Sequence, residues 1–273
     1  MQQVRKPPAR WPWLVVAVVA GAAGWWLLRP AMPVHQAPAS AETAAPGGAP
    51  PPPVATGSDA PRIQHPLEPL PDAADEAIPA LADSDALVFG ELEALSGDPS
   101  LLGLLIREHL VQRLVVMVDN LTEPRVQTSV MALRSPPGQY AVVEGEGAAV
   151  DDMQANTARY APYVAAFTGA EPQRLANTYR RLYPLFQQAY AEIGGPDAYF
   201  NDRLVQVIDH LLQAPPPPSA AALVRDERGR WRHVDPALES ASVGHKALMR
   251  LSPGQQTAVK QQLRALRRAL ARP

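Results

Sequence analysis

The sequence predicts a mainly α-helical protein, a helical bundle with minor β-hairpin insertions that is preceded by one transmembrane helix and a disordered linker. Three observations support this prediction: an uncharged apolar run over residues 11–28, a proline- and alanine-rich stretch over residues 29–79, and apolar residues at helical spacing over most of residues 80–273. The 273 residues therefore divide into a short tail (1–10), an anchor, a linker and one helical domain.

The composition excludes several classes of function. The formal net charge is -2, so the chain has no global basic field that would attract nucleic acid, and we expect no nucleic-acid partner. The chain has no cysteine, which excludes disulfides, thiolate metal sites and cysteine nucleophiles. An exported domain without disulfides depends on its apolar core, which favours a domain of fair size.

The apolar run over residues 11–28 has nearly the length that a bilayer core requires. Indole rings prefer the membrane interface, and tryptophans stand at both ends of the run, at Trp11, Trp13, Trp25 and Trp26. Three basic residues precede the run, Arg5, Lys6 and Arg10, and only Arg29 follows it closely. The positive-inside rule therefore predicts a single-pass anchor with a cytoplasmic N-terminus and the domain on the far side of the membrane.

A cleaved signal peptide is the alternative for this segment, because its basic start and apolar middle have the same pattern. Signal cleavage needs small residues directly after the apolar run. The best such site here, Ala39-Ser40-Ala41, lies well past its end. This spacing favours an uncleaved anchor.

The segment from Pro30 to about Pro71 contains proline, alanine, glycine and small polar residues without apolar periodicity. This composition predicts a semi-extended tether with local polyproline II character. Such a tether either lifts the domain away from the membrane or is a simple spacer without a binding role. Nothing in the sequence supports a third role, as a ligand for proline-recognition domains.

Helical patterns begin after residue 83. Asp83 or Ser84 is positioned to cap a first helix, which ends before Gly97. A long amphipathic run from Ser100 to Leu121 predicts a second helix, because apolar and charged residues occupy opposite faces.

The next part of the chain is irregular between residues 125 and 150, with a short strand predicted at residues 140–143. Helices resume at about Met153, and a long one is predicted from Pro172 to Ile193. Asp197 is expected to cap a further helix that runs to Leu212.

The C-terminal part begins with a predicted hairpin, in which residues 223–224 and 231–234 pair across a turn near Arg228-Gly229. Two closing helices follow. The last one starts with Ser252 as its cap, Pro253 at the first helical position and Gln255 completing a capping box.

The common catalytic signatures are absent from the sequence: it has no His-Glu-x-x-His zinc motif, no Gly-x-Ser-x-Gly elbow and no phosphate-binding loop. We therefore assign no catalytic residue, metal ligand or cofactor.

The densest polar cluster lies in the helix that ends at Leu212. Asp202 and Asp209 share one face of that helix, and Arg203 and His210 line an adjacent stripe. Three interpretations remain open: a solvated face with helix ion pairs, a structural network with Tyr160, Tyr179 or Asn156, or a ligand, metal or catalytic site. Asp202 and Asp209 are two turns apart, too far to chelate one ion without a third element.

A second polar segment runs from Asn156 to Tyr163, where tyrosines beside Arg159 and Pro162 suit either a recognition surface or helix packing. The candidate ligand- or partner-binding residues are therefore Asn156, Arg159, Tyr160, Asn201, Asp202, Arg203, Asp209 and His210. A basic stripe on the last helix suits either anionic lipid or peptidoglycan, or an ordinary exposed face; it comprises Lys260, Arg264, Arg267 and Arg268.

These segments together resemble the bacterial domain-of-unknown-function 3014 family over most of residues 80–270. The matching segments are Asn156-x-x-Arg159-Tyr160-x-Pro162-Tyr163, Tyr179-Arg180-x-x-Tyr183-Pro184-Leu185, Tyr199-Phe200-Asn201-Asp202-Arg203-Leu204, Ile208-Asp209-His210-Leu211-Leu212 and Asp235-Pro236-x-Leu238-Glu239. The Phe-Asn-Asp-Arg-Leu segment is the most specific of them. The resemblance implies a Gram-negative inner-membrane protein with its domain in the periplasm, and it implies no mechanism.

The sequence thus favours a membrane-anchored periplasmic protein that acts as a non-enzymatic interaction or scaffold module of the cell envelope, with an envelope protein as its partner. Two alternatives stay open, both using the face of Asn201-Asp202-Arg203 and Asp209-His210. One is an envelope hydrolase; the other is a small-ligand- or lipid-binding domain, which requires an apolar pocket between helices.

Overall fold

The computed structural model describes residues 63–67, 78–95, 99–144 and 148–271. The predicted anchor and most of the predicted linker lie outside the described residues, so both stay predictions. Across the ranges that the structure describes, no helix combines the length and the apolar character needed to cross a bilayer.

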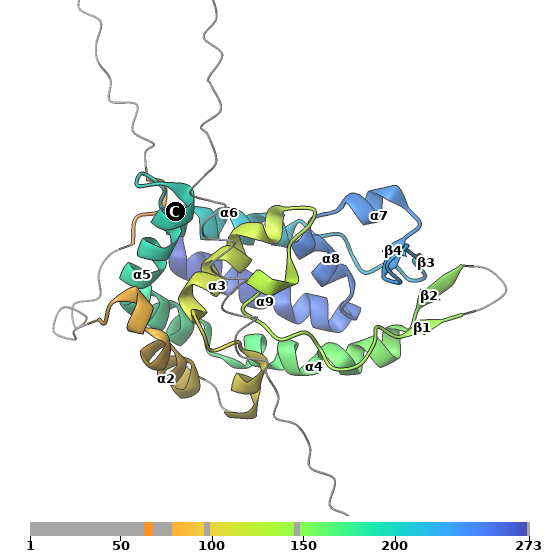
Figure 1. Cartoon of the computed structure of the whole chain (residues 1–273), viewed down its shortest axis with the longest axis horizontal. Helices are drawn as coiled ribbons and strands as arrows, with labels where there is room; N and C mark the ends of the chain where they lie inside the picture. The colour runs from red at the N-terminus through yellow and green to blue at the C-terminus, as the bar shows by residue number, and fades with distance from the viewer. Residues whose placement is uncertain (1–62, 68–77, 96–98, 145–147, 272–273) are drawn as a thin grey trace, which may run out of the picture. The chain divides into compact units, whose positions relative to one another are not determined.

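The domain is mainly helical with one small antiparallel sheet, as the sequence predicts (Figure 1). The described helices are α2 (Asp85–Leu95), α3 (Leu110–Asp119), α4 (Met153–Gly169), α5 (Pro172–Gly194), α6 (Phe200–Leu212), α7 (Pro236–Ser240), α8 (Val243–Met249) and α9 (Pro253–Leu270). The strands are β1 (Val142–Val143), β2 (Ala149–Asp151), β3 (Ala222–Arg225) and β4 (Trp231–His233).

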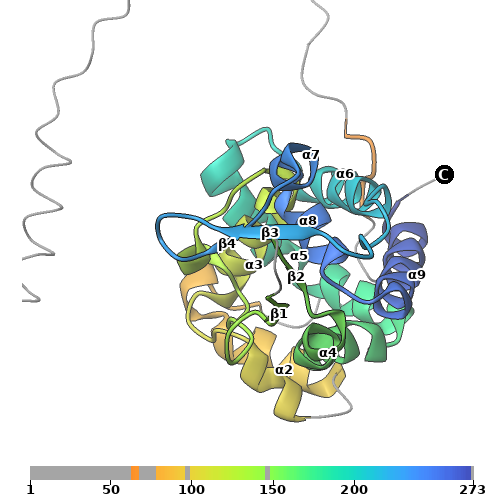
Figure 2. The same cartoon turned by 90° about the vertical axis from the view of Figure 1, so that its right-hand side faces the viewer.

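The helices pack around two main groups of buried apolar side chains. In the first group, α2, α3 and α5 surround Phe200, which is 1% exposed and stacks on Phe186 with ring centroids 5.9 Å apart. In the second, α6 and α8 pack against Leu263 and Leu266 of α9. Helix α9 contacts α4, α5 and α6, so the last helix of the chain joins the two groups (Figure 2).

The four strands form one sheet in the order β1-β2-β3-β4, with every pair antiparallel. The predicted hairpin is β3–β4, and its turn uses Gly229 at φ 71°, a conformation that favours glycine. The sequence did not predict that β2 pairs with β3, where Ala149 lies opposite Leu223. This pairing joins the two hairpins at one end of the helical bundle (Figure 1).

The prediction of one long helix from Ser100 to Leu121 was wrong. The chain forms a 3₁₀ segment (Pro99–Leu104), and α3 begins only at Leu110, after His109 at φ 53°. The Asp85 carboxylate accepts the N–H groups of His109 (2.8 Å) and Leu110 (2.7 Å). A cap supplied by another helix thus fixes the start of α3, and local periodicity does not reveal it.

Two smaller predictions also need correction. Asp197 does not cap α6, because the helix begins at Phe200, whose N–H donates to Gln187 Oε1 at 2.9 Å. Three closing helices are present where two were expected, since α7 precedes α8 and α9. The capping box of Ser252 and Gln255 at the start of α9 is confirmed.

Candidate functional site

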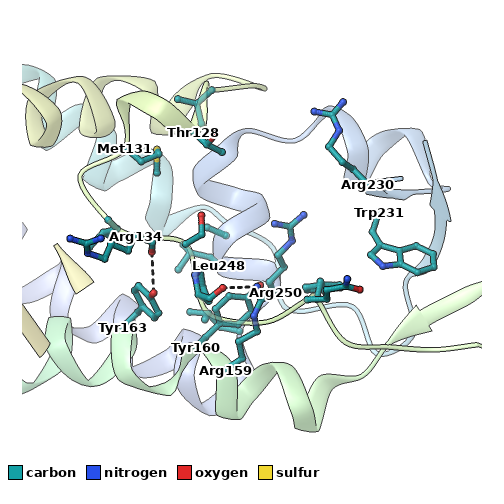
Figure 3. Close-up of a pocket in the computed structure, with 18 of the residues that line it drawn as sticks. Thr128, Met131, Arg134, Arg159, Tyr160, Tyr163, Arg230, Trp231, Leu248 and Arg250 are labelled. Carbon is teal, nitrogen blue, oxygen red and sulfur yellow. Dashed lines mark hydrogen bonds between the residues drawn. The ribbon is translucent and has the colours of Figure 1, made fainter. Parts of the chain in front are cut away.

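A cavity of about 810 Å³ lies between α4, the segment before β1, the β3–β4 hairpin and α8 (Figure 3). Arg134 and Tyr163 lie at one end of the view, Arg230 and Trp231 at the other, and Arg250 between them. The volume lies within the range of small-molecule sites in proteins.

One wall of the cavity is a face of α4. Arg159, Tyr160, Tyr163, Val164 and Phe167 line the cavity, and their spacing of three to four residues places them on one side of the helix. The start of this helix is fixed by its N-cap, Asp152, whose side chain accepts the main-chain N–H of Ala155.

Asn156 holds that helix against the strand segment beside it. Its side chain is fully buried and forms two hydrogen bonds with the main chain of Ala141, donating to the oxygen (2.7 Å) and accepting from the nitrogen (3.1 Å). It also donates to Asp151 at 2.6 Å. Asn156 therefore positions the end of the cavity that contains Tyr140, without lining the cavity itself.

The opposite wall is one face of the β3–β4 hairpin. Leu223 lies opposite His233 and Arg225 opposite Trp231, so these four side chains point to the same side of the sheet. The Arg225 guanidinium lies 4.3 Å from the centre of the Trp231 ring, a cation–π contact. Asp226 fixes the turn, and hydrogen bonds from the main chain of Arg230 hold the pKa of that carboxyl far below its usual range.

The described lining contains five arginines and no aspartate or glutamate. Arg230 pairs with Asp226 at 2.9 Å, and Arg225 lies 3.9 Å from Glu144, with both side chains largely exposed. Arg159 donates to three main-chain carbonyls, those of Pro136, Pro137 and Gly138, which carry no net charge.

The remaining two arginines of the lining are Arg134 and Arg250. Neither guanidinium forms an ion pair with any carboxylate among the residues that the structure describes. Arg134 is exposed, whereas Arg250 is half-buried at the end of α8. An unpaired cation partly removed from water attracts an anion more strongly than an exposed one does.

Three titratable side chains next to Arg250, those of Tyr140, Tyr160 and His233, are uncharged at neutral pH. Burial raises the pKa of Tyr140, and the nearby charge of Asp151 raises it further. Burial likewise raises the pKa of Tyr160 and lowers that of His233. The charge of Arg250 lowers the pKa of Tyr140, Tyr160 and His233 alike. Both phenols therefore keep their protons and His233 is neutral at neutral pH, so these three groups do not compensate the charge of Arg250.

The lining of the cavity combines arginine side chains with hydroxyl groups and apolar surface. The Nδ1 atom of His233 is buried and has no hydrogen-bond partner among the described residues. Within the described ranges, no three His, Asp or Glu side chains come together as metal ligands. The arginines instead offer charged donors beside apolar and aromatic surface.

Of the eight residues that the sequence singled out, Arg159 and Tyr160 line this cavity. The residues of α6 lie elsewhere. The Asp202 carboxylate accepts the main-chain N–H groups of Gln64 (2.8 Å) and His65 (2.7 Å), and the fully buried Asn201 donates to the His65 oxygen at 2.7 Å. These two side chains thus hold residues 63–67, which belong to the predicted linker, against α6.

The other charged residues of α6 contact other helices. Arg203 donates to the carboxylate of Asp119 at 2.6 Å, to its main-chain oxygen at 2.7 Å and to the Thr122 hydroxyl at 2.8 Å. Asp209 accepts two hydrogen bonds from Arg267 of α9, one of them 2.9 Å long. The carboxylate and guanidinium groups on this face of α6 therefore already form hydrogen bonds with other parts of the protein.

His210 stacks on His245 of α8 with ring centroids 4.0 Å apart, and its Nε2 shares a hydrogen bond of 2.7 Å with the Ser242 hydroxyl. The α6 residues thus form links between helices, which agrees with the interpretation as a structural network. Their hydrogen-bond partners are not the three that the sequence suggested, Tyr160, Tyr179 and Asn156.

Sequence reasoning missed Arg134, Arg225, Arg230, Trp231 and Arg250. A signal was present for the hairpin, since alternation along a strand places Arg225 and Trp231 on one face. No local signal marks Arg250, because its lack of an acidic partner is a property of the folded arrangement.

One family model matches the chain, that of the "Protein of unknown function (DUF3014)", over residues 110–267. No curated protein and no solved structure matches it. The matched region contains both the network on α6 and most of the cavity lining, and it covers more than half of the sequence. The chain therefore belongs to the DUF3014 family.

Proposed function

We propose that this protein is a non-enzymatic ligand-binding module of the bacterial cell envelope, held at the inner membrane by residues 11–28 with its domain in the periplasm. The observation that carries the binding function is the cavity of about 810 Å³, which combines apolar and aromatic walls with a few polar groups. Sites with this volume and composition are typical of small-molecule binding.

The geometry supports the small-ligand alternative better than the hydrolase. Asp202, Asp209 and His210 would carry a hydrolytic reaction, yet each contacts other protein groups, and none lines the cavity. The ligand site thus moves from α6 to the space between α4, α8 and the hairpin.

A variant that fills the cavity tests the binding function. Ala247 is an exposed residue of α8 that lines the cavity, so Ala247→Trp places an indole in the cavity with little change to the core. Ala161→Trp, at an exposed position of α4 away from the lining, is the matched control. Native mass spectrometry of the full chain should show a bound small molecule that is lost in Ala247→Trp and kept in Ala161→Trp. Equal occupancy of both variants, or an empty wild-type chain, contradicts the proposal.

The proposed location at the inner membrane rests on the sequence. Its support is the tryptophans at both ends of the apolar run and the basic residues before the run. Alkaline phosphatase fused after residue 273 is active only when it is exported, so the fusion should be active and should sediment with membranes. An inactive fusion, with a fluorescent cytoplasmic reporter at the same position, contradicts the orientation.

A further inference from the structure

The cavity also indicates the chemical class of its ligand, an inference that rests on the proposed function. We propose that the ligand is an anionic amphiphile, a phosphate or carboxylate head joined to one aliphatic chain, and that Arg250 binds the head. Three features of the lining support this class: an arginine without an acidic partner, a protonated phenol beside it, and an aliphatic surface next to both.

Arg250 is the arginine best placed to bind the head. It is half-buried, its guanidinium lies 5.4 Å from the centre of the Tyr140 ring, and no described carboxylate pairs with it. Tyr160 also lines the cavity, and its hydroxyl group can donate to a ligand. A planar guanidinium and a hydroxyl donor are suited to a carboxylate or phosphate group.

The other four arginines are less suited to this role. Arg159 uses its donors on main-chain carbonyls, Arg230 is paired with Asp226, and Arg225 lies against Trp231. Arg134 has no acidic partner, but it is exposed at one end of the cavity, so water screens its charge. It adds attraction for a negative ligand without fixing where the head lies.

The surface available to the tail is aliphatic. Leu248 and Leu251 are 6% and 8% exposed and form part of the lining, together with Met131, Leu133 and Val164. Methionine and leucine side chains adapt to a flexible chain, and no acidic residue interrupts this surface. An aliphatic tail would lie against these side chains and would itself be removed from water.

A peptide is a poorer fit than an amphiphile. An extended peptide would add to the free edge of β4, the edge strand of the sheet that lines the cavity. That edge is blocked, because Glu239 accepts the main-chain N–H of His233 at 3.1 Å and also pairs with Arg232 at 2.7 Å.

The test uses the full chain in nanodiscs of phosphatidylcholine, a lipid without net charge, with empty discs as the blank. Octyl phosphate, nonanoate, octanol and inorganic phosphate are titrated by calorimetry. Octyl phosphate or nonanoate should bind at least about tenfold more tightly than octanol or inorganic phosphate, a factor that corresponds to about 1.4 kcal/mol. Ala247→Trp should abolish this binding.

Arg250→Gln should weaken the binding of octyl phosphate at least about tenfold, and Arg250→Lys, which keeps the charge, should restore most of it. Arg264→Gln, at an exposed position of α9 outside the lining, is the control and should bind as the wild type does. The Lys variant separates loss of the charge from a failure to fold.

Each other result overturns a defined part of the inference. Equal binding of octanol and octyl phosphate, with no effect of Arg250→Gln, overturns the anionic head and leaves the proposed function standing. Inorganic phosphate that binds as tightly as octyl phosphate overturns the tail. Binding of all four probes that is unchanged in Ala247→Trp places them outside the cavity and overturns the proposed function as well.

Discussion

The carboxylate of Asp202 accepts the main-chain N–H of His65 at 2.7 Å, across 137 residues of sequence. Asn201 binds the oxygen of the same residue, and the Tyr199 hydroxyl accepts the N–H of Leu67 at 2.9 Å. The most specific segment of the family resemblance therefore holds residues 64–67, a part of the predicted linker, through main-chain atoms. Its contacts define where the chain enters the folded domain, and they can be tested one at a time.

Asp202→Asn should release residues 63–67 from α6. The amide side chain can accept one N–H group but presents its own donors to the other, so a charge-assisted hydrogen bond is lost. We expect the free energy of unfolding to fall by about 1–2 kcal/mol, and the amides of Gln64 and His65 to lose protection from hydrogen exchange. Urea denaturation and exchange measured by mass spectrometry give the two values.

Asp197→Asn provides the control for this experiment. Asp197 is exposed and precedes α6 by a few residues, and the variant removes the same charge without touching residues 63–67. Unchanged amide protection in Asp202→Asn would show that the contact does not hold the segment in solution.

Much of the fold was predictable because its signals are local. Ser252, Pro253 and Gln255 specify the start of α9 within four residues, and the helical period is sufficient for α4 and α5. The break before α3 was not predictable, because it depends on a carboxylate from α2. The same holds for the pairing of β2 with β3, since strands this short carry little information about register.

The two ion pairs of α6 should differ in their contribution to stability, because they differ in exposure. The side chains of Arg203 and Asp119 are 18% and 33% exposed, against 41% and 40% for Arg267 and Asp209. Arg203→Met leaves a carboxylate and a hydroxyl without their donor and should cost about 2–3 kcal/mol. Arg267→Met should cost less than about 1 kcal/mol, since water screens the exposed pair. Urea denaturation compares them directly, and equal losses would contradict this ranking.

Gly244 of α8 lies against Leu121 so closely that a side chain has no room. A Cβ added there would lie 2.8 Å from the Leu121 main-chain oxygen and 2.3 Å from a methyl carbon of Leu211. Gly244→Ala should therefore lower the free energy of unfolding by about 1–3 kcal/mol. Gly254 of α9 has no atom within 4 Å of its added Cβ, so Gly254→Ala is the control and should be neutral or stabilise by up to about 1 kcal/mol. The same loss in both variants would point to backbone effects instead of packing.

The candidate site was predictable only in part. Arg159 and Tyr160 were found because they belong to the segment from Asn156 to Tyr163, in which tyrosines stand beside an arginine and a proline. The residues of α6 drew attention because acids, a base and an imidazole lie close in sequence, yet other helices supply their partners. Arg250 had no such neighbours. A charge that lacks a partner can be recognised only when every element packed around it is known.

Acidification should destabilise the domain through two half-buried imidazoles, those of His210 and His233. Burial lowers the pKa of His210 from its ordinary value of 6.5, and the charges of His245 and Arg203 lower it further. Burial and Arg250 lower the pKa of His233 in the same way. The unfolded chain then binds protons at a higher pH than the folded chain does, so stability rises with pH in this range. It is fully present above about pH 6.5 and is lost as the pH falls toward the folded pKa values.

The measurement is the free energy of unfolding in urea between pH 7.5 and 5.0. His210→Gln and His233→Gln should each flatten the decline on the acid side, because each removes one group that the folded state holds neutral. The free energy of unfolding of each variant at pH 7.5 serves as its internal reference. At that pH both imidazoles are largely unprotonated, in the folded chain and in the unfolded chain. If a variant that carries both substitutions loses stability with falling pH as steeply as the wild type does, carboxylates and not these imidazoles set the acid response.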